Sequence, residues 1–287
     1  MNSMRTFFAG GILLLAGLLT SCEQRVNIQL PYEGDKIVVN SLLQPDSVAY
    51  IRVTRSVPAN VYDDSGFQEI NNAQVVLQQD GVDLSPLQPQ VIKGRTYFVS
   101  KEKVTTGKVY TIKAAASGMT PVSGEDTLPP SPVVYDPATQ RGSTKVQFIL
   151  EDRAGVPDYY QIRLFTYGPD MQPDTIRSFR LDPVLSNNLI DAITNSYYST
   201  LIMSDVRFDG KTATFVLETD LPINASQVMV EVSALTKNAY LYFRSISMQQ
   251  KTSGGLITEP VTVFTNIRNG YGIVAGINSK RLVFKAE

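Results

Sequence analysis

The stretch VAYIRVT, residues 48–54, alternates apolar and polar side chains and decides the class of fold. In an extended strand successive side chains point to opposite faces, so Ala49, Ile51 and Val53 share one face. Alternation with a period of two over this length predicts a β-strand with that face buried.

The same pattern recurs along the chain and predicts further strands at residues 37–40, 73–78, 96–99, 108–114, 145–150, 159–167, 213–219, 227–235, 261–266 and 281–285. Gly, Asp and Pro residues separate these strands, as is typical of an antiparallel sandwich. A helical period appears over residues 236–250, with Thr236 as N-cap and with Ala239, Tyr242, Phe243 and Ile246 on one face. Residues 187–193 are a candidate short helix. The glycine-rich residues 266–276 are expected to turn tightly. We predict a mainly β protein of two β-sandwich-like domains, of the immunoglobulin or transthyretin kind, the second with one or two short helices.

A proline-rich string, DTLPPSP at residues 126–132, marks the expected boundary between the domains. Its prolines lack the N–H that a sheet ladder needs and favour an extended connector. We therefore predict an N-terminal β-sandwich domain at 36–127, a linker at 128–134 and a C-terminal β-rich domain at 135–287. The alternative is a proline-rich loop inside one larger sandwich.

The first residues predict a secretory leader. One basic residue, Arg5, precedes an apolar run over residues 7–19 that is too short for a permanent membrane span. The run ends in Leu19-Thr20-Ser21-Cys22, which resembles the lipobox of bacterial lipoproteins, where the cysteine becomes the first mature residue and carries acyl chains. We expect a signal peptide at 1–21, lipidation of Cys22 and a polar tether at 22–35, so that the lipid attaches the protein to the membrane. The alternative is a free cysteine that happens to end a secretory signal.

Composition excludes several classes of function. Without Arg5 the mature chain has 25 basic and 27 acidic residues, so no positive surplus favours nucleic acid. The chain has no histidine, which excludes Ser-His-Asp and Cys-His catalysis and histidine zinc sites. Cys22 is the only cysteine, so the chain forms no internal disulfide. No cofactor and no catalytic residue are predicted.

Several segments together resemble a known family: the lipobox, IVVN at 37–40, INNAQV at 70–75, Asp152 with DYY at 158–160, and TNIRNGYGI at 265–273. They resemble the Bacteroidota outer-membrane lipoproteins grouped as domain of unknown function 4249. Members are often encoded beside TonB-dependent transporters, so the resemblance implies an outer-membrane accessory role with such a transporter as partner. No catalytic residues are established for the family. Val274 stands where phenylalanine is usual.

The resemblance has two further implications. Surface-displayed lipoproteins of this phylum carry an acidic run after the lipidated cysteine, whereas this chain has Glu23-Gln24-Arg25, so the periplasmic and the cell-surface face both stay open. Proteins of the phylum are O-glycosylated at Ser or Thr between an Asp and an apolar residue. Ser47, Thr127 and Thr175 match that pattern, and Thr127 is preferred because it lies beside the expected linker.

Tyrosine pairs are the candidates for ligand or partner binding: Tyr159 with Tyr160, and Tyr197 with Tyr198. Adjacent strand residues face opposite ways, so half of each pair is expected in the core. Glu151-Asp152 and Asp158 are interpreted as solvated turn acids rather than a carboxylate pair for hydrolysis. The string DDSG at 63–66 is interpreted as an acidic turn rather than a calcium loop, and no metal site is predicted.

The first functional hypothesis is therefore a lipid-anchored outer-membrane accessory or binding subunit without enzymatic activity. A structural or adhesin-like surface lipoprotein is the second hypothesis, and a carboxylate-based hydrolase the third.

Overall fold

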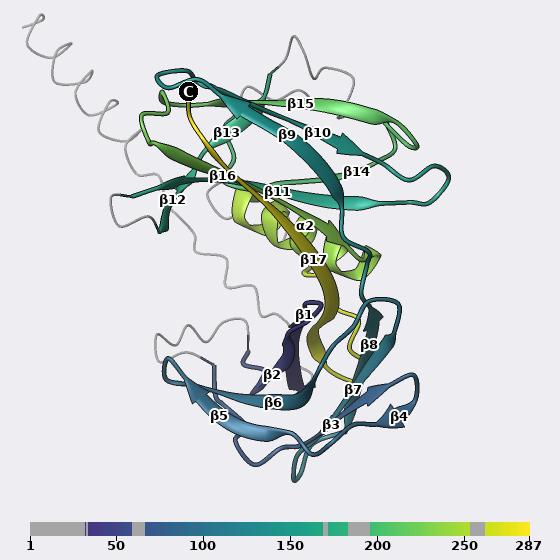
Figure 1. The fold of residues 1–287 in the computed structure, drawn as a ribbon. Helices are drawn as coiled ribbons and strands as arrows, with labels where there is room; N and C mark the ends of the chain where they lie inside the picture. The colour runs from purple at the N-terminus through teal and green to yellow at the C-terminus, as the bar shows by residue number, and fades with distance from the viewer. Residues whose placement is uncertain (1–31, 33, 59–66, 169–171, 183–195, 253–261) are drawn as a thin grey trace, which may run out of the picture. The chain divides into compact units, whose positions relative to one another are not determined.

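The computed structural model describes residues 32, 34–58, 67–168, 172–182, 196–252 and 262–287 (Figure 1). The chain divides into two units, Met1–Gly34 with Pro58–Asp64, and Asp35–Val57 with Ser65–Glu287. Everything below concerns the second unit. The expected leader, the lipobox, the helix at 187–193 and the acidic turn at 63–66 lie outside the described residues. Within the described part, no helix combines the length and the apolar character needed to span a membrane.

Strands make up most of the described chain. They are β1 Ile37–Leu43, β2 Val48–Arg55, β3 Gln74–Gln79, β4 Val82–Asp83, β5 Gln88–Ile92, β6 Arg95–Lys103, β7 Val109–Ala115, β8 Val122–Thr127, β9 Val133–Thr139, β10 Lys145–Glu151, β11 Tyr159–Tyr167, β12 Pro173–Arg177, β13 Phe179–Leu181, β14 Leu201–Ser204, β15 Thr212–Thr219, β16 Gln227–Leu235 and β17 Tyr271–Lys285. The helix of the described residues is α2, Lys237–Thr252. The mainly β class is confirmed.

These strands form three sheets. One has nine strands in the order β12-β11-β16-β17-β1-β2-β6-β5, with β14 beside β11. The other two have four strands each, in the orders β13-β15-β10-β9 and β4-β3-β7-β8. Each small sheet covers a different part of the large one, which gives the sandwich-like layers.

The first core lies between β1, β2 and β6 of the large sheet and the sheet that contains β3, β7 and β8. Ala49, Ile51 and Val53 are buried there, as their alternation predicts. Tyr110 is fully buried in this core, and its hydroxyl donates a 3.1 Å hydrogen bond to Gln79 Oε1.

The second core lies between β11 and β16 of the large sheet and the sheet β13-β15-β10-β9. Phe148 of β10 stacks on Phe215 of β15 with ring centroids 5.4 Å apart. Along the chain, buried residues up to Leu128 belong to the first core and those from Val134 belong to the second. The change from one core to the other therefore falls at the proline-rich stretch. Ile267 and Val274 nevertheless pack in the first core, although they lie in the range predicted for the C-terminal domain.

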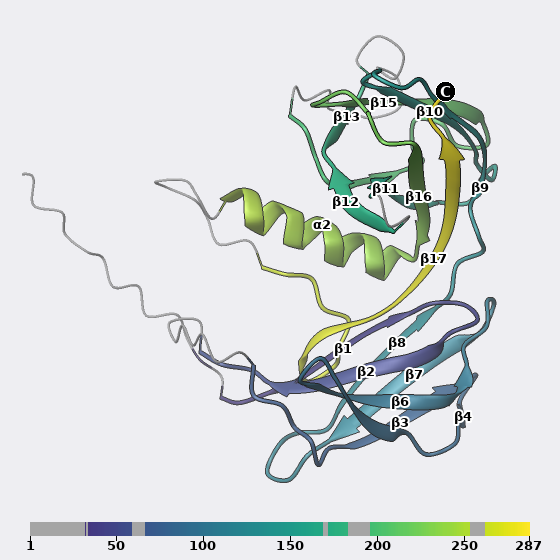
Figure 2. The ribbon, with the colours of Figure 1, turned by 60° about the vertical axis from the view of Figure 1, so that its left-hand side comes forward.

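Strand β17 contributes to both sandwiches because it is a single strand of 15 residues (Figure 2). Residues 271–276 pair in parallel with β1, and residues 277–285 pair antiparallel with β16. The predicted tight turn over 266–276 is present only at Asn269 and Gly270, where Asn269 has a φ of +63°, because the strand already begins at Tyr271. Gly272 and Gly276 permit close packing instead: a Cβ would lie 2.0 Å from Val39 O and 1.9 Å from Thr127 O, respectively.

The predicted strand at 261–266 is also wrong, since residues 262–266 form no strand. The Asn266 side chain takes the place of a strand partner. Its Oδ1 accepts a 3.0 Å hydrogen bond from Val274 N and its Nδ2 donates a 2.7 Å bond to Val274 O.

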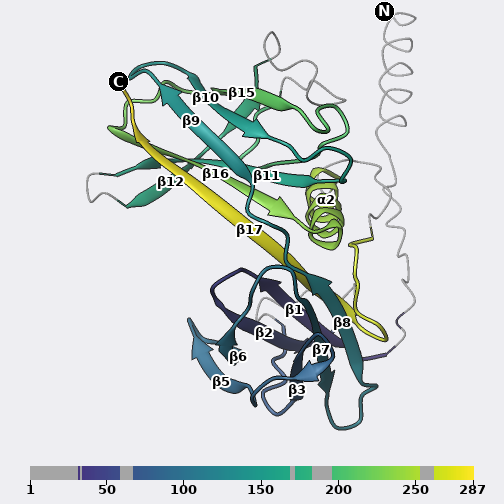
Figure 3. The same ribbon diagram turned by 45° about the vertical axis from the view of Figure 1, so that its right-hand side comes forward.

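Helix α2 begins where its sequence predicts. Thr236 caps it, and the Ala239 N–H donates a 3.3 Å hydrogen bond to the Thr236 hydroxyl. The helix packs on the face of β16 and β17 opposite the second core (Figure 3). Ala239, Tyr242 and Phe243 of the predicted helical face belong to this third packing cluster.

Candidate functional site

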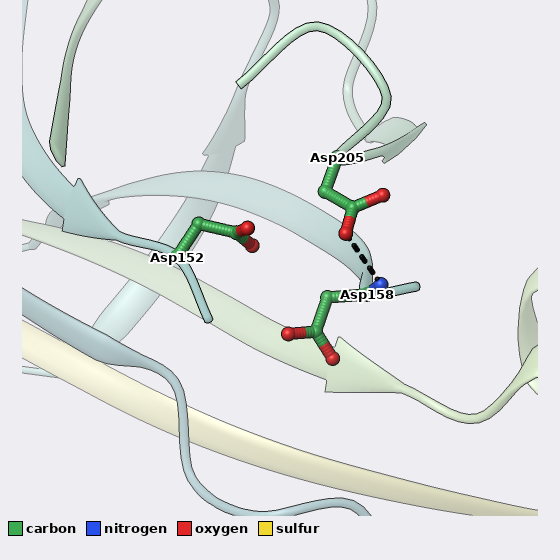
Figure 4. Close-up of side chains that lie close together, drawn as sticks. All are labelled: Asp152, Asp158 and Asp205. Carbon is green, nitrogen blue, oxygen red and sulfur yellow. Dashed lines mark hydrogen bonds between the residues drawn. The ribbon is translucent and has the colours of Figure 1, made fainter. Parts of the chain in front are cut away.

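Three buried aspartates lie together at strand ends: Asp152 directly after β10, Asp158 directly before β11 and Asp205 directly after β14. One carboxylate oxygen from each lies within 4.8 Å of the others (Figure 4). We call these three residues the acidic cluster. Asp152 and Asp158 are 7 % and 8 % exposed, so their interpretation as solvated turn acids is wrong. They are buried because the loop after β14 folds back over the loop between β10 and β11.

Hydrogen bonds explain why burial of Asp152 is tolerated. Its Oδ1 accepts a 2.7 Å bond from the Tyr160 hydroxyl and its Oδ2 a 2.9 Å bond from the Gly210 N–H. A buried carboxylate needs such donors, because without them nothing compensates for the hydration that the charge loses on burial. Asp152 thereby ties the loop that follows β14 to the start of β11.

Asp158 and Asp205 join the same two segments. Asp205 Oδ2 accepts a 2.7 Å bond from the Asp158 N–H, and Asp158 O accepts a 3.0 Å bond from the Asp205 N–H. Both carboxylate oxygens of Asp158 accept bonds from the Arg153 guanidinium, the Nε bond being 2.9 Å long. Five of the six carboxylate oxygens in the acidic cluster thus accept a hydrogen bond from the described chain.

The pKa shifts in the acidic cluster follow from burial and from neighbouring charges. Burial raises the pKa of Asp205, and the neighbouring carboxylates add to that rise. Burial also raises the pKa of Tyr160, and its hydrogen bond to Asp152 acts in the same direction. The hydrogen bond to Asp158 raises the pKa of Arg153.

The Arg153 guanidinium pairs with Asp158 and places one positive charge beside these carboxylates. The acidic cluster is therefore a clamp that fixes β14 beside β11. Sequence reasoning missed Asp205, which is 47 residues from Asp158; its only local signal is an acid at the end of a strand-like run.

A pocket of about 400 Å³ opens beside the strands that this clamp fixes. We call it the tyrosine pocket; its walls are Gln161 of β11, residues 197–200 with Ile202 of β14, and Phe243, Ile246 and Ser247 of α2. Gln161 and Ile202 lie opposite each other in the β11–β14 ladder. Phe243, Ile246 and Ser247 follow the i, i+3, i+4 spacing that places side chains on one face of a helix. Phe243 and Ile246 belong to the helical face that the sequence predicts; Ser247 does not.

The segment that carries Tyr197 and Tyr198 is fixed from its other side. Tyr198 exchanges two backbone hydrogen bonds with Phe179 of β13, of 2.7 and 2.9 Å. The Arg180 guanidinium lies 5.3 Å from the ring centroid of Tyr197, within the range of a cation–π contact.

The structure brings only two of the four predicted tyrosines to this pocket. Tyr160 is 3 % exposed and lies in the second core, so it is a core residue rather than a binding residue. Tyr159 points to the opposite face, as adjacent strand residues do, and stacks on Tyr240 of α2 with ring centroids 4.5 Å apart. Tyr197 and Tyr198 line the pocket.

The residues of the predicted modifications have different surroundings. Thr127 is exposed at the end of β8, but Leu128 beside it is buried. Ser47 is half-buried in the turn between β1 and β2. Thr175 belongs to β12, and its side chain lies outside the described part, as do Leu19, Thr20, Ser21 and Cys22.

Comparison with known proteins places the chain in a family. No curated protein matches it. A family model described as a domain of unknown function, DUF4249, matches residues 23–282, which is most of the chain. The chain therefore belongs to the DUF4249 family.

Proposed function

We propose that this protein is a lipid-anchored accessory subunit of the outer membrane that captures a ligand for a TonB-dependent transporter. The observation that carries the proposal is the tyrosine pocket. Its volume of about 400 Å³ is in the range of small-molecule sites, and its walls come from β11, β14, α2 and the segment 197–200, which other contacts fix in place. A preformed pocket on a rigid scaffold favours binding, because little order has to be imposed on the protein when the ligand enters.

Lipid attachment is supported by the lipobox. Cys22 follows Leu19-Thr20-Ser21, and the family match begins at residue 23, directly after the cysteine. Multiple acyl chains on Cys22 exceed the two signals that stable membrane anchoring needs. Cys22→Ala is expected to abolish palmitate incorporation and to release the protein into the soluble fraction.

The proposal is tested by affinity purification of the tagged full-length chain from detergent-solubilised membranes of its own cells. We expect a TonB-dependent transporter to co-purify with the wild type and to be lost with Cys22→Ala. Protease treatment of intact cells then shows which face of the outer membrane carries the protein. If the wild type recovers no transporter, the accessory role is wrong, and a structural or adhesin-like role takes its place.

A further inference from the structure

We infer that the tyrosine pocket binds a neutral, polyhydroxylated ligand of the chemical class of a mono- or disaccharide. This inference rests on the proposed binding function and adds the nature of the ligand. Three properties of the pocket carry it: the absence of charged side chains among its described lining residues, the kind of hydrogen-bonding groups these residues present, and the apolar surface between them.

Among the residues that the structure describes, those that line the pocket include no Asp, Glu, Lys or Arg. An ionised ligand entering it would lose hydration without gaining an opposite charge, which is costly. Two cations of the described chain that neighbour lining residues, Arg180 beside Tyr197 and Arg244 beside Phe243 in the sequence, have other partners. Arg180 Nε and Nη2 donate bonds of 3.1 and 3.0 Å to Glu218, and Arg244 Nη1 donates a 3.1 Å bond to the Tyr240 hydroxyl.

The polar groups of the walls both donate and accept hydrogen bonds. Gln161 presents an amide, and Tyr197, Ser199, Thr200 and Ser247 present hydroxyls. Groups that both donate and accept hydrogen bonds suit a ligand whose groups also do both, and hydroxyl groups are the simplest example. A purely apolar ligand such as an acyl chain would leave these groups desolvated without partners.

Apolar surface completes the match. Ile202 faces the pocket from β14, and Phe243 and Ile246 face it from α2. A sugar ring has C–H groups on its faces and hydroxyls around its rim, so it needs apolar and hydrogen-bonding surface in one site. A small polar ligand without C–H groups, such as urea, would leave the apolar wall unused.

The test is binding of defined probes to the full-length, lipidated protein in detergent. The probes are neutral gluco-, manno-, galacto- and xylo-oligosaccharides of one to four rings, with oligogalacturonates of equal length as charged counterparts. Ser247→Trp places a large ring in the pocket. Met248→Trp is its matched control, because Met248 is the next residue of α2, is 48 % exposed and does not line the pocket. Gln161→Ala removes the amide and leaves the helix unchanged.

We expect at least one neutral oligosaccharide to bind the wild type. Binding should weaken about tenfold or more in Ser247→Trp and Gln161→Ala, as for a central contact, and stay unchanged in Met248→Trp. Thermal unfolding of each variant shows whether it folds. Gln161→Ala keeps the test valid if Ser247→Trp unfolds.

Three outcomes overturn the inference. The ligand class is wrong if no neutral oligosaccharide binds, or if the oligogalacturonate binds more tightly. The location is wrong if a neutral oligosaccharide binds and folded Gln161→Ala and Ser247→Trp bind it equally well. Co-purification of a transporter with the wild type is measured in a separate experiment. A failure of the proposed ligand class can therefore be distinguished from a failure of the proposed accessory role.

Discussion

The carboxylate of Asp126, in β8, accepts a hydrogen bond from the hydroxyl of Thr236, which caps α2 110 residues later in the chain. The same carboxylate oxygen accepts a 3.1 Å bond from the N–H of Gly276 in β17, and the other oxygen a 2.9 Å bond from the Thr127 N–H. One carboxylate thus joins β8, the start of α2 and the middle of β17. Since α2 forms a wall of the tyrosine pocket, this contact also helps to position the pocket.

Asp126→Ala is expected to lower the free energy of unfolding by about 1–3 kcal/mol, because the Thr236 hydroxyl and the Gly276 N–H lose their acceptor. Urea unfolding followed by circular dichroism measures the loss. The prediction is contradicted if the midpoint stays at the wild-type value.

The pH dependence of stability gives a second result at Asp126. Burial raises its pKa, outweighing the hydrogen bonds that oppose the rise. A carboxyl whose folded pKa is raised stabilises the fold when protonated, and this stability is lost as the pH rises through the folded pKa. Relative to Asp126→Asn, which does not titrate, the wild type should therefore gain stability as the pH falls from about 7 to about 4. Parallel unfolding curves for the two proteins would show that Asp126 is not responsible.

Tyr160→Phe tests the clamp formed by the acidic cluster. The change removes the hydroxyl that donates to Asp152 and leaves a buried carboxylate oxygen without that bond. We expect a loss of about 1–3 kcal/mol in the free energy of unfolding. Tyr159→Phe is the matched control, because among the described residues the Tyr159 hydroxyl has no hydrogen-bond partner, and its effect should be within about 0.5 kcal/mol. Equal effects of both changes would exclude the clamp.

Gly276→Ala tests the close approach of β17 to β8. The added Cβ would lie 1.9 Å from Thr127 O, so the two strands have to separate, and we expect a loss of about 3 kcal/mol or more. Gly107→Ala is the control: its Cβ meets no atom within 4 Å, and only its φ of +79° opposes the change, at a cost of about 1–2 kcal/mol. Thermal and urea unfolding compare the two variants. A Gly276→Ala protein as stable as Gly107→Ala would contradict the packing argument.

Glu231→Gln tests a buried charge on β16. Glu231 is 2 % exposed, and it accepts bonds of 2.9 Å from Arg163 Nε and 2.8 Å from Arg281 Nε. Burial alone would raise its pKa, but the bonds from Arg281 and Arg163 outweigh burial and lower it. We expect a loss of about 1–3 kcal/mol near neutral pH.

The pH dependence of stability in the acid range gives a second test of Glu231. A carboxyl with a lowered folded pKa contributes stability above its unfolded pKa, and this stability is lost as the pH falls through the folded value. The difference between wild type and Glu231→Gln should therefore shrink below about pH 4.3. Asp35→Asn removes the exposed partner of Arg55 and should change stability by less than about 1 kcal/mol. A constant difference across the acid range would assign the loss to packing instead.

Strand positions were largely predictable, because alternation of side chains is a local property of the chain. Residues 159–167 and 227–235 are strands with the predicted bounds, and Thr236 is the predicted cap of α2. The errors in the predicted elements lie where glycine and asparagine can serve either a turn or the packing of a strand. Gly272 and Gly276 suggest a turn locally, yet they serve close packing within β17, and nothing local separates the two uses.

The candidate site was only half predictable. Tyr197 and Tyr198 were expected at a binding surface, and they line the pocket. Gln161, Phe243 and Ser247 have no local feature that identifies them as its other walls, because the pocket exists only where β11, β14 and α2 meet. The burial of Asp152 and Asp158 was missed for the same reason, since their donors come from Tyr160, Gly210 and Arg153 after the loops have closed.

The β class, the positions of most strands and the start of α2 follow from local sequence, because periodicity and capping depend on neighbours along the chain. Long-range contacts specify that β17 pairs with both β1 and β16, that Asp205 joins Asp152 and Asp158, and that a pocket forms beside them. The physical reason is that pairing and burial depend on contacts between distant segments, whose choice follows from the packing of the whole core.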